Sequence, residues 1–326
     1  MINKTKYQNM NKKELNNMLL SACSNRFLEI VQYLLSSSEL KEHADIHHKN
    51  NYGINALMYA CRYGFLDIVQ YLLTSPELKE HADIYDKDNN GKNVLMYACE
   101  NGHLTIVKYL LSSPELKEHA NIHDKDNNGR NALMIACLKG EIDIVKYLLT
   151  SPELTKHADI HHKNNYGMNA LILACRNGHL DIVQYLLTSN DLKEHACIHY
   201  KNNYGMNALM IACYDGYLNI VQYLLTSPEL TEHTNIHDKD KADWNALMTA
   251  CANEHLDIVQ YLIIDMDIQV DKNTIHWLQV QGGNNKIKKI CEETLKLIQY
   301  RGLHQQLDKS LNSDIINNKK ANGIKI

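Results

Sequence analysis

The chain has 326 residues and carries 34 Lys and Arg against 38 Asp and Glu, which gives a net charge of −4 and a pI near 6.5. A nucleic-acid-binding face needs a surplus of basic residues, so this balance argues against a nucleic-acid partner. The sequence has no apolar run of about 18 residues and no signal-peptide core at its start, so we expect a cytoplasmic protein without membrane contact.

The first 14 residues are polar, and the sequence then repeats with a period of 38 residues. The marker of the period is a cysteine column: Cys23, Cys61, Cys99, Cys137, Cys175, Cys213 and Cys251. Such a period is typical of solenoids, in which units stack because none can bury its apolar face alone. We expect an array over 15–272, with repeats near 15–44, 45–82, 83–120, 121–158, 159–196, 197–234 and 235–272.

Each repeat reads as turn, helix, turn, helix and extra turn. Asn55 and its equivalents precede an apolar stretch such as ALMYAC, and an Asn there predicts a helix N-cap. Two glycine columns, beginning at Gly53 and Gly64, predict turns with positive φ. The stretch LDIVQYLL from residue 66 predicts the second helix, and Ser75-Pro76 predicts an extra turn or 3₁₀ piece.

These motifs resemble ankyrin repeats. Residues 126–137 (DNNGRNALMIAC) match the D-x-x-G-x-T-P-L-H-x-A-A pattern of that family, and residues 178–183 (GHLDIV) match its G-H-L-x-I-V segment. The resemblance covers roughly residues 15 to 265 and implies an all-α solenoid of helix-turn-helix units with short hairpin loops. Because N-A-L-M replaces T-P-L-H, it also implies that the usual histidine hydrogen bond between repeats is lost. Long near-identical arrays of this kind resemble those of large DNA viruses, protists and host-associated bacteria, which implies possible delivery to a host cell.

Beyond the array we expect a C-terminal helical cap over 273–311 and a disordered tail over 312–326. Asn273 is a predicted N-cap, and Gly302 is the predicted end of a helix over 286–301. The cap would seal the last repeat, as terminal repeats need a polar outer face. The alternative is an adaptor in which these helices recruit an enzyme such as a ubiquitin ligase.

Histidines form two periodic columns near the hairpins. These are His43, His81, His119, His157, His195 and His233, and His47, His123, His161, His199 and His237. A metal site needs three or four converging ligands, so we interpret the columns as hydrogen-bonding positions and expect no metal. Equivalent cysteines in stacked repeats should lie about 10 Å apart, beyond the roughly 7 Å limit for a disulfide, so we interpret them as small buried side chains. The sequence contains no phosphate-cradling loop, nucleophile elbow or H-E-x-x-H motif, so we expect no enzyme activity and no cofactor.

The repeats differ mainly at the hairpin tip and at the exposed end of the first helix. In ankyrin proteins these positions line the concave partner-binding surface, so the resemblance implies the same use here. The expected partner-binding residues form a basic middle zone and an aromatic, Met-rich C-terminal zone: Lys92 and Arg130, then Tyr166, Met168, Tyr204, Met206, Tyr214 and Trp244. The alternative interpretation is that the tip tyrosines stack on one another between repeats. We expect a monomeric, non-catalytic protein-protein interaction module.

Overall fold

The computed structural model describes residues 7–116, 119–266, 270, 272–280, 289 and 291–303, and this part of the chain contains helices and turns but no β-strand. It divides into two compact units, Met1–Cys197 and Ile198–Ile326. No described helix is both long and apolar enough to cross a membrane. The expected disordered tail over 312–326 and the last part of the expected cap, 304–311, lie outside the described residues.

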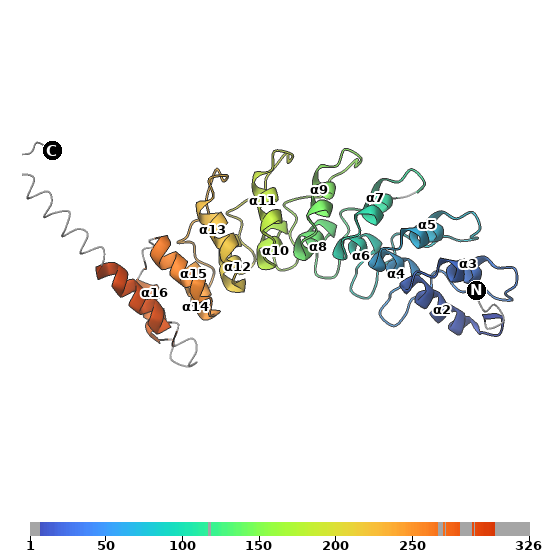
Figure 1. Ribbon diagram of the computed structural model, residues 1–326, viewed down its shortest axis with the longest axis horizontal. Helices are drawn as coiled ribbons and strands as arrows, with labels where there is room; N and C mark the ends of the chain where they lie inside the picture. The colour runs from blue at the N-terminus through green and yellow to red at the C-terminus, as the bar shows by residue number, and fades with distance from the viewer. Residues whose placement is uncertain are drawn as a thin grey trace, which may run out of the picture. The chain divides into compact units, whose positions relative to one another are not determined.

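The first unit consists of five helix pairs (Figure 1). Their bounds are α2 Lys12–Ser24 and α3 Leu28–Ser36, α4 Ala56–Tyr63 and α5 Leu66–Thr74, α6 Val94–Glu100 and α7 Leu104–Ser112, α8 Ala132–Lys139 and α9 Ile142–Thr150, and α10 Ala170–Arg176 and α11 Leu180–Thr188. Each first helix packs on the first helix of the next pair, and each second helix packs on the next second helix. This is the stacked helix-turn-helix arrangement that the period predicts, and the all-α fold class is confirmed.

The second unit continues the same pattern and then departs from it. Its helices are α12 Ala208–Asp215, α13 Leu218–Thr226, α14 Ala246–Ala252, α15 Leu256–Gln260, the π-helix η1 Tyr261–Asp265 and α16 Lys272–Val280, and residues 291–303 are also helical. In the last repeat the Ser-Pro turn is absent, and α15 runs directly into η1. Asn273 lies within the first turn of α16, so its predicted role as N-cap is wrong. Gly302 does not end its helix, because the helix continues to residue 303.

The asparagine at the start of each first helix is an N-cap, as predicted. Asn55 Oδ1 accepts a hydrogen bond of 2.9 Å from the amide of Met58, and Asn93, Asn131, Asn169, Asn207 and Asn245 do the same three residues on. The other end of the amide reaches the next repeat, where Asn55 Nδ2 donates to Asp86 Oδ2 at 2.8 Å. Two more pairs repeat this contact: Asn93 with Asp124, and Asn207 with Asp238. A side-chain bond between repeats is therefore present although the family's usual histidine is replaced.

The core is formed by the facing sides of the helices. In α4 the side chains of Leu57, Met58, Ala60 and Cys61 are fully buried, and the other first helices repeat the pattern. All seven cysteines of the column are buried and free, which confirms that they are small core side chains. Burial raises the pKa of every thiol in the column, to about 12 for Cys251, so the thiols stay protonated.

Before the last repeat, the extra residues of the repeats form a turn after the second helix, as predicted. Leu78 N donates to Ser75 O at 3.2 Å, and the ring of His81 bonds the same carbonyl at 3.0 Å. Ala82 N then donates to Leu72 O at 2.9 Å and returns the chain to the helix pair. All six histidines of the first column make this bond to the serine carbonyl six residues earlier: His43, His81, His119, His157, His195 and His233.

The terminal repeats keep the backbone of the others with different residues. Asn11 and Glu14 form a reciprocal capping box, so α2 begins at Lys12, slightly before the expected start of the array. At three positions where another residue replaces a column glycine, the backbone still adopts positive φ: 58° at Arg26, 68° at Asp243 and 66° at Glu254. The fold therefore imposes left-handed backbone on side chains that disfavour it.

Candidate interaction surface

The hairpin tips are fixed by one polar side chain per repeat. In the third repeat Asp88 Oδ1 accepts the amides of Asn90 at 2.9 Å and Lys92 at 2.8 Å. The same pair of hydrogen bonds recurs at Asn50, Asp126, Asn164, Asn202 and Asp240. The residues two and four positions later, which include most of the expected partner-binding residues, are therefore held by their own backbone amides.

Neighbouring hairpins are also tied to one another. Asn89 donates its amide to Tyr52 O at 3.1 Å and its side chain to Asn51 O at 2.9 Å. Gly53 adopts φ +77°, and a Cβ there would lie 2.5 Å from Asn89 Oδ1. The column is glycine because the backbone is left-handed and because the next hairpin approaches so closely.

The aromatic candidates divide into exposed and packed residues. Tyr166 is 48% exposed, and in the second unit Tyr204 is 56% and Tyr214 48% exposed. Within its own unit, neither Tyr166 nor Tyr204 makes a ring contact with another described residue. Trp244 differs, because its ring lies 5.1 Å from that of Trp277 in an edge-on contact.

The two methionine candidates also differ. Met206 is partly exposed, whereas Met168 is only 7% exposed, and its sulfur lies 3.7 Å from Arg176 Nη1. The exposed residue that our expected set omits is Tyr52, which is 71% exposed and occupies the same tip position as Tyr166. Its membership of that column was the signal that could have found it.

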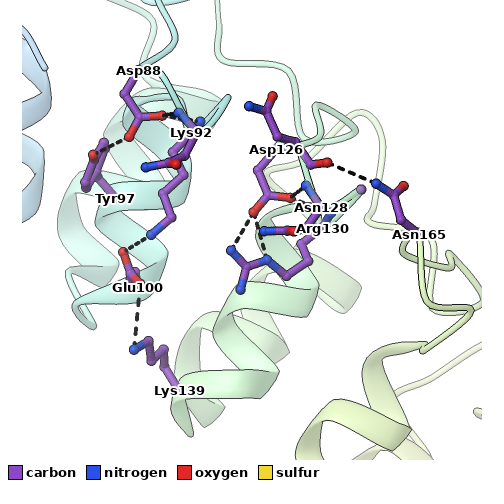
Figure 2. A network of polar contacts seen from close by, with 12 residues as sticks. Asp88, Lys92, Tyr97, Glu100, Asp126, Asn128, Arg130, Lys139 and Asn165 are labelled. Atoms are coloured by element: carbon purple, nitrogen blue, oxygen red, sulfur yellow. Dashed lines mark hydrogen bonds and ion pairs between the residues drawn. The ribbon is translucent and has the colours of Figure 1, made fainter. Parts of the chain in front are cut away.

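The two basic candidates are ion-paired rather than free (Figure 2). Lys92 Nζ lies 2.7 Å from Glu100 Oε2, and Lys139 Nζ lies 3.7 Å from Glu100 Oε1. Arg130 pairs with Asp126 Oδ2 through Nη2 at 2.6 Å and Nε at 2.8 Å, and the Asp126 side chain is fully buried. The middle repeats therefore present a charge-compensated network, which the sequence did not reveal.

A buried tyrosine completes this network. Tyr97 donates its hydroxyl to Asp88 Oδ2 at 2.7 Å, and burial, reinforced by the Asp88 carboxylate, raises the pKa of Tyr97. In the preceding repeat the polarity is reversed, since Asn50 Nδ2 donates to the hydroxyl oxygen of Tyr59 at 3.1 Å. In these two repeats the tip residue therefore matches its tyrosine: Asp88 accepts from the Tyr97 hydroxyl, and Asn50 donates to the Tyr59 hydroxyl.

A groove of about 540 Å³ opens on this face of the first unit. Aromatic and charged side chains line it, and we call it the unit-1 groove. Its lining residues are Tyr52, Ile54, Tyr59, Arg62, Asp88, Asn90, Lys92, Tyr97, Glu100, Asn101 and Lys139. A volume of this size accommodates a few side chains of a partner.

Several other histidines contact a neighbouring repeat. His103 Nε2 donates to the carbonyl of Arg62 at 3.0 Å, and His179 and His255 make the same bond to Leu138 and Tyr214. Three members of the second column face glutamates of the next repeat: His47 with Glu80, His161 with Glu194 and His199 with Glu232. Within the described residues no three His, Cys, Asp or Glu side chains converge as a metal site would require.

Comparison with known proteins agrees with this architecture. The family model of ankyrin repeats in three copies matches residues 2–88, 76–156, 151–235 and 198–274, which together span most of the chain. No curated protein sequence matches the chain significantly. The repeated helix pairs, the capping asparagines and this match together show that the chain belongs to the ankyrin-repeat family.

Proposed function

We propose that the protein is a non-catalytic interaction module that binds a protein partner through its hairpin tips and the exposed ends of its first helices. Ankyrin repeats generally serve as protein-protein interaction modules, and the proposal assigns this use to a defined surface. The observation that carries it is the exposure of Tyr166 and Tyr204. Both amides are hydrogen-bonded to a buried asparagine, so the two rings stand in solvent on an ordered backbone.

Exposed, pre-positioned tyrosines suit a binding surface for a physical reason. Tyrosine offers a large contact area at a small loss of side-chain entropy, and it is enriched among the residues that dominate interface energies. Ordering of the hairpins before binding further lowers the entropy lost on association. Within the proposed set we assign direct contact to Tyr166, Tyr204 and Tyr214, and a supporting role to Met168 and Trp244.

The C-terminal helices are proposed to seal the last repeat of the second unit. Asn245 Nδ2 donates to Thr274 Oγ1 at 2.8 Å, so α16 supplies the bond that the next repeat supplies elsewhere. Cys251 Sγ also lies 3.6 Å from Thr294 Oγ1 in the following helix. These contacts favour the cap over the adaptor alternative, in which the same helices would recruit an enzyme.

Affinity capture followed by mass spectrometry tests the proposed surface. The test variant is Tyr166→Ala/Tyr204→Ala, with one substitution in each unit. The matched control is Tyr85→Ala/Tyr300→Ala, which removes one exposed tyrosine from each unit outside the hairpin tips. The proposal requires a partner that the unmodified chain and the control retain and the test variant loses, with circular dichroism unchanged in all three. Equal recovery by all three would contradict it.

A further inference from the structure

The unit-1 groove carries an excess of positive charge on a chain whose net charge is −4. We propose that it binds an acidic, extended segment of a partner protein, whose carboxylates pair with Arg62 and Lys139. The inference rests on the proposed function and specifies the chemistry of the partner.

Neither carboxylate of the groove is free to repel such a segment. Asp88 is buried and already accepts three hydrogen bonds, from the amides of Asn90 and Lys92 and from the hydroxyl of Tyr97. Glu100 is held by Lys92 and also faces Lys139. Glu100 is therefore paired with lysines, and the buried Asp88 carboxylate is occupied by hydrogen bonds from within the protein.

The cations of the groove are not equally engaged. The Lys92 side chain is 17% exposed and its Nζ lies 2.7 Å from Glu100, whereas the Lys139 side chain is 41% exposed and lies at the longer distance of 3.7 Å. Arg62 is exposed and makes no ion pair with any described residue, and its guanidinium rests 5.7 Å from the ring of Tyr63. With three cations and two carboxylates, the unmatched positive charge resides on Arg62 and on the weakly held Lys139.

The chemistry of these groups selects the occupant. A guanidinium binds a carboxylate through two parallel hydrogen bonds, which gives direction as well as charge. Tyr52 is the most exposed tip tyrosine and borders the same groove, so it offers an aromatic face to a neighbouring apolar side chain. A groove of about 540 Å³ holds a few side chains of an extended segment rather than a folded domain.

Selection of short random peptides by phage display tests the inference without knowledge of the partner. The unmodified chain is compared with Arg62→Ala/Lys139→Ala and with the control Lys108→Ala/Lys146→Ala. Both double variants remove two positive charges, but Lys108 and Lys146 lie on the second helices α7 and α9, outside the groove. We expect enrichment of peptides that combine Asp or Glu with an aromatic or aliphatic residue, and loss of that preference only in the groove variant.

The best acidic peptide, labelled with fluorescein, is then titrated in fluorescence anisotropy. We expect affinity to fall about tenfold or more in the groove variant and less than about twofold in the control. Neutral or basic peptides, an equal loss in both variants, or no enriched peptide would overturn the inference. A single-stranded oligonucleotide that displaces the peptide equally well would also overturn it, because it would indicate a general anion site. If the tip tyrosines still govern partner capture in any of these cases, the proposed function stands and only the acidic segment is rejected.

Discussion

The hydroxyl of Tyr97 donates to Oδ2 of Asp88 across 2.7 Å, and both side chains are buried. The same carboxylate holds the hairpin tip through Oδ1. A core side chain of the first helix is thereby linked to the tip that the helix supports, so the shape of the surface depends on a buried polar contact.

Loss of this contact is expected to destabilise the fold. Tyr97→Phe leaves one oxygen of the buried Asp88 carboxylate without its donor, which should lower the free energy of unfolding by about 1–3 kcal/mol. Asp88→Asn should be milder, because its amide can donate to the Tyr97 hydroxyl as Asn50 does to Tyr59. Urea denaturation of both variants measures the difference, and equal destabilisation by the two would contradict this account.

The Arg130–Asp126 pair offers a test by exchange between repeats. Arg130→Met alone leaves the fully buried Asp126 carboxylate without its ion-pair partner and should cost about 3–5 kcal/mol. Adding Asp126→Asn recreates the combination of the next repeat, Asn164 with Met168, and should restore most of the lost stability. Thermal unfolding of the single and double variants checks this. Additive losses would show that the two positions are not coupled.

The repeat period was sufficient to predict the helix pairs, because the internal copies place the same capping asparagine, core residues and turn glycines in register. Asn55, for example, caps its helix as its position before an apolar stretch predicted. The exposure of individual surface residues was not predictable in the same way. Met168 and Tyr166 both occupy the tip, yet Met168 is buried and Tyr166 is half exposed. The backbone between the two residues turns at Gly167, which has positive φ.

The charges of Lys92 and Arg130 show the same limit. Their partners Glu100 and Asp126 are visible in the sequence, but the pairing of Lys92 with Glu100 depends on side-chain rotamers. Arg130 pairs with Oδ2 of Asp126, because Oδ1 already accepts the hairpin amides. The bond from Asn55 to Asp86 likewise joins residues of different repeats, and only the stacking distance between repeats determines it.

The terminal repeats should be open to stabilisation. Glu254 adopts φ 66°, where a side chain costs roughly 1–2 kcal/mol and glycine costs far less, so Glu254→Gly should raise the free energy of unfolding by about 1 kcal/mol. The opposite change at Gly140→Ala should destabilise, because φ is 83° there and the new Cβ would lie 2.6 Å from His179 Cε1. A lower melting temperature for Glu254→Gly would refute the argument.

Alkaline pH is expected to destabilise the protein through its buried thiols. Burial raises the pKa of Cys251 from 9.0 to about 12, so the unfolded chain releases this proton at lower pH than the folded chain does. The contribution is fully present below about pH 9 and is lost as the pH rises toward 12. Cys251→Ala should therefore show a shallower loss of stability above pH 9 in denaturation at a series of pH values. An unchanged slope would contradict the assignment.

Partner affinity tests the central claim most directly. Once a partner has been captured, isothermal titration calorimetry compares the unmodified chain with Tyr166→Ala/Tyr204→Ala and with the control Tyr85→Ala/Tyr300→Ala. The account predicts at least about a tenfold loss of affinity in the tip variant, since a central interface tyrosine typically contributes more than about 1 kcal/mol, and little change in the control. Unchanged affinity in a folded tip variant would show that the partner binds elsewhere on the chain.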